Sequence, residues 1–157
     1  AGVKHYNLNE PEFTFDDDDP DGYHTGYDRI RPKLGGEKVG ATHYLIRPGQ
    51  SLCPYHYEYG EEEWLLVLEG TPTIRHPDGE EQLREGDIVA FLEGPEGAHK
   101  VSNATDADVR VLMWSNIAPL GAAVYPDSDK ILIAPPDRSD RVMVERSSDV
   151  DYWTGER

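Results

Sequence analysis

Cysteine is almost absent from this sequence: Cys53 is the single thiol among 157 residues. One thiol cannot form an internal disulfide, and it excludes a zinc site built on several thiolates. Long apolar runs are absent too. The longest has about five residues, at 64–68, whereas a membrane-spanning helix needs about 20. The first residues turn polar without an apolar signal-peptide core, so we expect no membrane association and a cytoplasmic protein.

Basic residues are scarce relative to acidic ones. The chain has 15 lysines and arginines against 31 aspartates and glutamates, which gives a net charge of −16. A molecule of this charge repels the phosphates of nucleic acid and the surface of an anionic membrane. We therefore expect no nucleic-acid partner, and we look for a small-molecule ligand or substrate instead.

The chain divides into three stretches that differ in composition and in hydrophobic pattern. Residues 1–26 are polar and acidic and are expected to form an irregular N-terminal arm. Residues 27–134 carry short apolar or alternating runs, separated by glycine and proline turn signals about every ten residues, which is typical of an all-β sandwich or barrel. The expected strands are 28–33, 42–47, 54–57, 63–68, 71–76, 81–84, 88–92, 99–103, 109–116, 122–125 and 131–134. No window of ten residues has a helical stripe. The tail, 135–157, is expected to pack on the barrel through Tyr152 and Trp153.

Two of the expected strands are apolar on both faces. In 64–68 the side chains of Leu65 and Val67 alternate with apolar neighbours, and 109–114 shows the same pattern. A strand with two apolar faces in a domain of this size needs a second layer or a partner chain on its outer side. We expect a homodimer.

Candidate metal ligands occur in two segments. His56 and Glu58 are two residues apart, so on a strand they share a face, and Glu63 opens the next strand on the face of Leu65. In the second segment His99 follows the turn 94–97 at the head of another short strand.

The spacing of these residues resembles the two motifs of the cupin superfamily. In the first, Glu63 lies five residues after Glu58 and Gly70 lies seven after Glu63. In the second, His99 follows Pro95-x-Gly97, and Asn103 lies four residues after it. The sequence departs from the usual pattern at Glu58, which stands where the second histidine of the first motif is expected.

The resemblance implies a single-domain cupin over 27–134. Its fold would be an antiparallel double-stranded β-helix, or jelly-roll barrel, commonly dimeric, with a divalent metal in the barrel mouth. By resemblance, His56, Glu63 and His99 take ligand positions. Two imidazoles and one carboxylate with open positions suit Fe, Mn, Ni or Zn. Glu58 is either a fourth ligand or a general base beside the metal.

The expected pocket is mostly apolar and aromatic, as small-molecule sites are. Its candidate lining residues are Tyr57 or Tyr59, Tyr44, Phe91, Val101 and Met113. Glu58 and Tyr57 are the candidate catalytic residues, since either could move a proton. Three arginines on expected strands could hold an anionic substrate, but we interpret each as part of a solvated strand face: Arg47, Arg75 and Arg110.

Two functions remain open at this point. The first is a metal-dependent enzyme acting on a small organic molecule, of dioxygenase, lyase or isomerase type, with the ligand set favouring oxygen chemistry. The second is a non-catalytic cupin that binds a metal or small molecule. Metal binding with turnover would distinguish the first from the second.

Other patterns receive a structural interpretation. Aspartates between 17 and 28 match the spacing of a calcium-binding EF-hand loop, but Pro20 interrupts it and no helices flank it, so we interpret it as an acidic loop. Cys53 is expected to be a small buried residue rather than a nucleophile. Glu61 and Glu62 are expected to be solvated charges.

Overall fold

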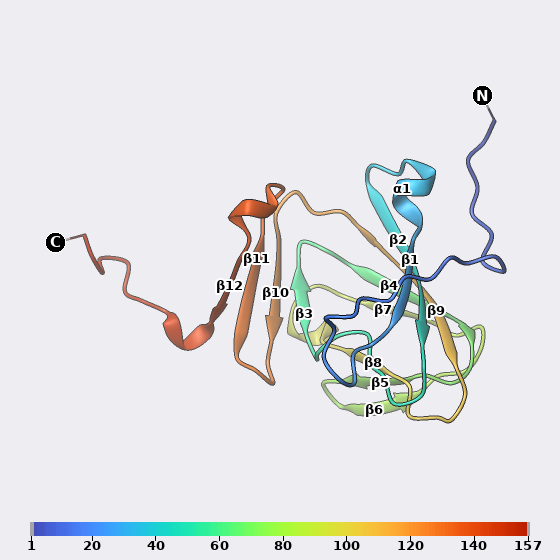
Figure 1. The fold of residues 1–157 in the computed structure, drawn as a ribbon. Helices are drawn as coiled ribbons and strands as arrows, with labels where there is room; N and C mark the ends of the chain where they lie inside the picture. The colour runs from blue at the N-terminus through green and yellow to red at the C-terminus, as the bar shows by residue number, and fades with distance from the viewer. Residues whose placement is uncertain (1, 157) are drawn as a thin grey trace.

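The computed structural model describes residues 2–156, and most of its regular secondary structure is antiparallel β-strand (Figure 1). A five-stranded sheet has the order β1-β2-β9-β4-β7, a three-stranded sheet the order β6-β5-β8, and a four-stranded sheet the order β12-β11-β10-β3. The strands are β1 (Gly26–Arg29), β2 (Val39–Ile46), β3 (Tyr57–Tyr59), β4 (Glu63–Glu69), β5 (Thr73–His76), β6 (Gly79–Gln82), β7 (Ile88–Phe91), β8 (Lys100–Ser102), β9 (Val109–Asn116), β10 (Gly121–Tyr125), β11 (Lys130–Ala134) and β12 (Val142–Glu145). The expected all-β jelly-roll barrel is confirmed.

The barrel interior is filled by every second residue of the central strands. On β4, Leu65 and Val67 are fully buried, and on β9, Val111 and Met113 are buried on the same side. The complete core cluster comprises Ile46, Leu65, Val67, Ile74, Leu83, Phe91, Val101, Val109, Val111 and Met113. Burial of these apolar side chains is the dominant stabilising term of the fold.

One expected strand, 28–33, is wrong in its second half. Strand β1 ends at Arg29, and the helix α1 (Ile30–Leu34) follows. Pro32 lies in the first turn of this helix, where a missing N–H costs nothing, and Gly35 ends it in the left-handed conformation with φ 76°. A five-residue helix is too short to show a helical stripe in the sequence. None of the helices within residues 2–156 has the length and apolar character to cross a membrane.

The outer face of the five-stranded sheet is partly covered by the N-terminal arm of the same chain. Tyr6 donates a hydrogen bond to Asp28 Oδ2 (2.8 Å), and its oxygen lies 3.2 Å from His43 Nδ1. Arg110 donates from Nη1 to His43 Nε2 (3.1 Å), so Nδ1 of a neutral His43 carries the proton and donates to Tyr6. Lys33 Nζ lies 2.7 Å from Asp28 Oδ1. This buried network ties the arm to β1, β2 and β9, and it supplies part of the covering layer that the apolar strands need.

Burial also sets the ionisation of this network. Burial of His43, together with the charge of Arg110, lowers the pKa of its imidazole to about 4. Burial of Asp28 acts to raise the pKa of its carboxyl, but hydrogen bonds from Lys33, the Glu12 backbone N–H and Tyr6 outweigh it and lower the pKa. The folded network therefore contains a neutral histidine and a charged aspartate.

The end of the C-terminal tail, which carries Tyr152 and Trp153, does not pack on the barrel of its own chain. Strand β12 pairs with β11, which pairs with β10, so the chain is carried away from the barrel, and the C-terminal end lies far from it in Figure 1. Residues 136–156 are all exposed. Tyr152 is 83% exposed and Trp153 is 55% exposed, and their rings contact only each other among the aromatic pairs of the described chain. The expectation that these aromatics pack on the barrel is wrong for the single chain, because the β11–β12 pairing directs them outward.

Candidate metal centre

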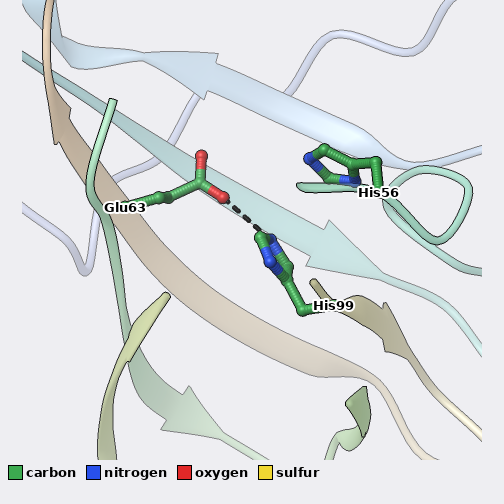
Figure 2. A group of neighbouring side chains, drawn as sticks. All are labelled: His56, Glu63 and His99. Atoms are coloured by element: carbon green, nitrogen blue, oxygen red, sulfur yellow. Dashed lines mark hydrogen bonds and ion pairs between the residues drawn. The ribbon is translucent and has the colours of Figure 1, made fainter. Parts of the chain in front are cut away.

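Three predicted ligands, His56, Glu63 and His99, converge inside the barrel. One ligand atom from each lies within 4.8 Å of the other two, and Figure 2 shows the three side chains pointing into a common space. His56 and His99 face each other in an isolated antiparallel bridge, in which each backbone N–H donates to the other's carbonyl (3.1 and 2.9 Å). Glu63 is the first residue of β4 and shares the inward face with Leu65.

Both imidazoles are oriented by backbone carbonyls. Nδ1 of His99 lies 2.8 Å from the Gly97 oxygen, and Nδ1 of His56 lies 2.9 Å from the Pro54 oxygen. A carbonyl oxygen only accepts, so both Nδ1 atoms carry a proton and the Nε2 lone pairs of the neutral rings face the centre. This arrangement is the one found for metal-ligating histidines, whose other nitrogen is held by a second partner.

The donor chemistry of the centre fits a cation. Nε2 of His99 lies 3.0 Å from Oε1 of Glu63, and both atoms are acceptors when the ring is neutral. Two acceptors at this separation repel unless a proton or a metal ion lies between them. Ligand atoms about 2.0–2.2 Å from one ion are at most about 4.4 Å apart, so the observed arrangement needs only a small side-chain adjustment to hold one.

Aromatic rings enclose both histidines. Phe91 stacks on His99 with ring centroids 3.6 Å apart, and Tyr125 stacks on His56 at 5.7 Å. His99 is 2% exposed and His56 is 6% exposed. Burial disfavours the imidazolium of His56, but the side chains of Cys53 and Glu58 and the Pro54 carbonyl outweigh it and raise the pKa of the ring. The surroundings therefore favour positive charge at this position.

Glu58 stands beside this centre and outside the three-residue group. Its Oε1 lies 3.6 Å from His56 Nε2, which confirms that the two side chains share a face of the chain. Glu61, expected to be a solvated charge, is instead half-buried, and burial together with the charge of Glu58 raises the pKa of its carboxyl. Glu62 is exposed, as expected. The side of the centre next to His56 thus holds more carboxylates than the motif spacing indicates.

Tyr57 does not lie with the ligands. It is 9% exposed and packs in a second apolar cluster with Tyr55, Ala98 and Val124. In an extended strand its side chain points away from the face used by its neighbours on either side. The phenol of Tyr44 lines a pocket with Glu63: burial and the charge of that glutamate raise its pKa to about 12, so it stays protonated and can donate.

A pocket of about 310 Å³ opens at this end of the barrel. Its inner wall is formed by inward-facing residues of three strands: Thr42 and Tyr44 of β2, Glu63 of β4, and Met113 and Ser115 of β9. Of the lining expected from the sequence, Tyr44 and Met113 are here, Phe91 covers His99, and Val101 is fully buried in the core.

The three arginines considered from the sequence have other partners. Arg75 forms an ion pair with Asp127, and Arg110 with Glu69. Arg47 lies over the ring of Phe15 at 4.3 Å. The arginines that do line the pocket were missed: Arg29, Arg31 and Arg138.

The acidic N-terminal loop forms no second metal centre. Asp28, the last residue of the calcium-like spacing, is 4% exposed, and both its carboxylate oxygens are engaged, by Lys33 and by Tyr6. Within residues 2–156, the trio in the barrel is the one group of three or more His, Cys, Asp or Glu side chains that could hold an ion. Cys53 is half-buried, with Sγ 3.5 Å from His56 Nδ1.

A small antiparallel barrel with histidine and carboxylate side chains gathered inside it defines the class of this protein. Residues 42–115 match the model of the cupin domain, so this part of the chain, the barrel, belongs to the cupin superfamily. Among curated proteins, none matches the chain in sequence.

Solved structures agree on the fold. A sugar phosphate isomerase from a cupin superfamily, from Silicibacter pomeroyi, is 22% identical with a TM-score of 0.80, covering 92% of this chain and 94% of that one. A candidate sugar phosphate isomerase from Acidithiobacillus ferrooxidans is 22% identical with a TM-score of 0.76, covering 83% and 81%. The polyketide cyclase RemF from Streptomyces resistomycificus is 19% identical with a TM-score of 0.62, covering 76% and 84%. At these identities the likeness establishes the fold alone.

Proposed function

We propose that this protein is a metal-dependent enzyme acting on a small organic molecule, with a divalent metal held by His56, Glu63 and His99. One observation carries the proposal: two Nδ1–H groups fixed on backbone carbonyls leave two Nε2 atoms that converge with a glutamate oxygen within 4.8 Å. Groups that only accept hydrogen bonds are brought together in this way at a cation site. Fe, Mn, Ni and Zn all fit this ligand set.

A proton-transfer reaction, of isomerase or lyase type, suits the surrounding residues best. A bound divalent metal would polarise a carbonyl or hydroxyl oxygen of the substrate. Glu58, with its carboxylate beside His56, is placed to remove a proton as a general base. The Tyr44 phenol lines the pocket that Glu63 also lines, and it can donate a hydrogen bond to a substrate oxygen. The similar Silicibacter pomeroyi protein is named a sugar phosphate isomerase, which is an activity of this reaction type.

Oxygen chemistry is the second candidate. Two histidines and one carboxylate with open positions are the ligand set of non-haem iron oxygenases. The apolar side chains of Phe91 and Met113 near this set would exclude water from a reactive intermediate. A third outcome, a cupin that binds metal or small molecule without turnover, remains the alternative to both enzyme types.

Metal analysis combined with two assays tests the proposal. The purified protein is reconstituted with Mn, Fe, Ni or Zn, and its metal content is measured. Incubation in D2O with a panel of hydroxy-aldehydes, ketoses and keto acids then reports exchange at carbon by NMR, while an oxygen electrode reports dioxygen uptake. We expect stoichiometric metal and carbon-bound deuterium without oxygen uptake. Oxygen uptake instead would establish the second candidate, and a metal-free protein would overturn the proposal.

We also propose a homodimer in the cytoplasm. The N-terminal arm leaves part of the outer sheet face uncovered, where Ile88 is 58% exposed and Trp64 is 38% exposed. Ile88 pairs across the strands with Leu66, and Trp64 stacks on Trp114, so these side chains form one apolar patch. A second copy of the chain would cover it. The one free thiol, Cys53, suits a reducing compartment.

A further inference from the structure

The pocket at the barrel mouth reverses the charge balance of the molecule. In the whole chain acidic residues outnumber lysines and arginines by 31 to 15. Among the residues lining this pocket the balance is three arginines to one carboxylate, that of Glu63. Arg29 lies at the end of β1 and Arg31 two residues later in α1, while Arg138 comes from the C-terminal tail, so two segments distant in the sequence bring positive charge to one opening.

These three arginines have no acidic partner of their own among the described residues. Arg75, Arg84 and Arg110 each have a carboxylate oxygen within 4.0 Å. Within residues 2–156, no ion pair joins a carboxylate to any of the three pocket arginines. In a protein with so many carboxylates, unpaired guanidinium groups around one opening indicate that their counter-charge comes from outside the chain.

Existing contacts hold two of the guanidinium groups in place and leave donors free. Arg31 donates from Nε to the Gly36 carbonyl (2.9 Å), which orients its fork and leaves the two terminal nitrogens available. Arg29 lies over the ring of Tyr27, 5.0 Å from its centroid. A guanidinium fork matches the paired oxygens of a phosphate or a carboxylate, with which it forms short, charge-assisted hydrogen bonds.

The position of the pocket relative to the metal centre indicates how a ligand would lie. Its inner wall includes Glu63, one of the three candidate ligands, and the hydroxyls of Thr42 and Ser115. Its volume of about 310 Å³ is at the lower end of the range for small-molecule sites, about 300–1,000 Å³. A metabolite-sized molecule therefore fits with one end at the arginines and the other end at the centre.

We propose that Arg29, Arg31 and Arg138 bind the anionic group, a phosphate or a carboxylate, of a small substrate whose reacting end lies at the metal centre beside Glu63. The part of this inference that concerns the reacting end of the substrate rests on the proposed function. The binding of the anion itself rests on the arginines alone. The net negative charge of the protein repels large polyanions. The three arginines attract a small anion to this one opening.

Calorimetric titration of the full-length, metal-reconstituted protein tests this inference. The probes are inorganic phosphate and three matched sugars: glucose, glucose 6-phosphate and glucuronate. We expect the charged sugars to bind at least 10-fold more tightly than glucose. The phosphate and carboxylate arms then identify the preferred anion, and dependence on the arginines in either arm supports the inference.

Three single variants, R29Q, R31Q and R138Q, remove one guanidinium each while their circular dichroism and metal content are checked. Each variant is expected to weaken binding of the charged sugar roughly 10- to 100-fold, as the loss of a charge-assisted hydrogen bond does. The control R84Q removes the same charge from an arginine that is paired with Asp87 on the surface and is expected to change nothing.

The outcomes separate this inference from the proposed function. If the protein holds metal but no anionic probe binds at millimolar concentration, or if all three variants bind as the wild type does, the inference is overturned and the metal site stands. If the protein holds no metal but anions bind through the arginines, the anion site stands and the proposed function fails. Titration of H99A, which we expect to lack metal, shows whether a probe binds the arginines or the metal itself.

Discussion

Nε2 of His99 lies 3.0 Å from Oε1 of Glu63, while Nδ1 of the same ring is held by the Gly97 carbonyl at 2.8 Å. The ring cannot satisfy both contacts in its neutral form, since it has one proton and two acceptors to meet. A second proton on the ring, or a metal ion at Nε2, would therefore satisfy the contact with Glu63. The ligand substitutions below follow from this relationship.

Replacement of His99 by alanine is expected to lower metal affinity at least about 100-fold, because one of two imidazole donors is lost. The barrel is expected to stay folded, since the core cluster of the β-strands does not include this ring. Metal content by mass spectrometry and far-UV circular dichroism are the measurements. His5→Ala removes an exposed histidine and serves as the control. Full metal occupancy in the His99 variant would contradict its assignment as a ligand.

Replacement of Glu58 by glutamine distinguishes its two candidate roles. The substitution keeps the size of the side chain and removes the carboxylate. Since Glu58 lies outside the three-residue group, we expect metal content to be unchanged and turnover to fall about 10²- to 10⁴-fold, the usual contribution of a general base. Loss of metal instead would make it a fourth ligand. Glu62→Gln changes an exposed neighbour and is expected to have no effect.

Gly97→Ala is expected to destabilise the fold by about 3 kcal/mol and to displace His99. A Cβ atom on Gly97 would lie 1.7 Å from the backbone oxygen of Leu92, so the chain has to move. Thermal unfolding and metal content are the measurements. Gly121→Ala is the matched control, because the nearest atom to its Cβ is 4.0 Å away. Equal stability of the two variants would contradict the tight packing inferred at Gly97.

The stability contributed by His43 is expected to depend on pH. Its pKa is about 4 in the folded chain, below the value of about 6.5 expected when unfolded. Protons therefore bind the unfolded state first, so this contribution is complete above about pH 6.5 and is lost as the pH falls toward 4, by on the order of 3 kcal/mol in all. Urea unfolding of the wild type and of His43→Gln between pH 7 and 5 measures the contribution of His43 to the free energy of unfolding. The difference in stability should shrink as the pH falls, and a constant difference would refute the buried neutral ring.

A charged residue at the uncovered patch is expected to dissociate the proposed dimer. Ile88→Lys places a lysine within the apolar patch on the outer sheet face, where a second copy would have to desolvate it. Light scattering coupled to size exclusion should show a dimer for the wild type and a monomer for the variant at micromolar concentration. Leu120→Lys changes another exposed apolar residue outside the patch and should leave the dimer intact. A wild-type monomer would refute this proposal directly.

The spacing of the motifs located the candidate metal centre because residues two apart on a strand lie on the same face. The proximity of Glu58 to His56 confirms this. The same rule, applied once more, places Tyr57 on the opposite face, where it packs with Tyr55. That signal was present in the sequence and argued against a catalytic role for Tyr57.

Other features carried no local pattern from which to predict them. Arg29 and Arg31 reach the pocket because the chain turns from β1 into α1, a helix too short to show periodicity. Arg138 comes from the C-terminal arm, whose path depends on the pairing of β11 with β12. Tyr125 covers His56 only because β10 pairs with β3. Each of these positions is set by long-range strand pairing.

The backbone bridge between His56 and His99 fixes the separation of the two imidazoles by peptide geometry. The hairpin of β5 and β6, which lies between them in the chain, could therefore be lengthened, shortened or replaced without altering the spacing of the two nitrogen donors. Such a barrel is a scaffold for engineering. Loop grafting can change what enters the cavity while the geometry of the two imidazoles stays the same.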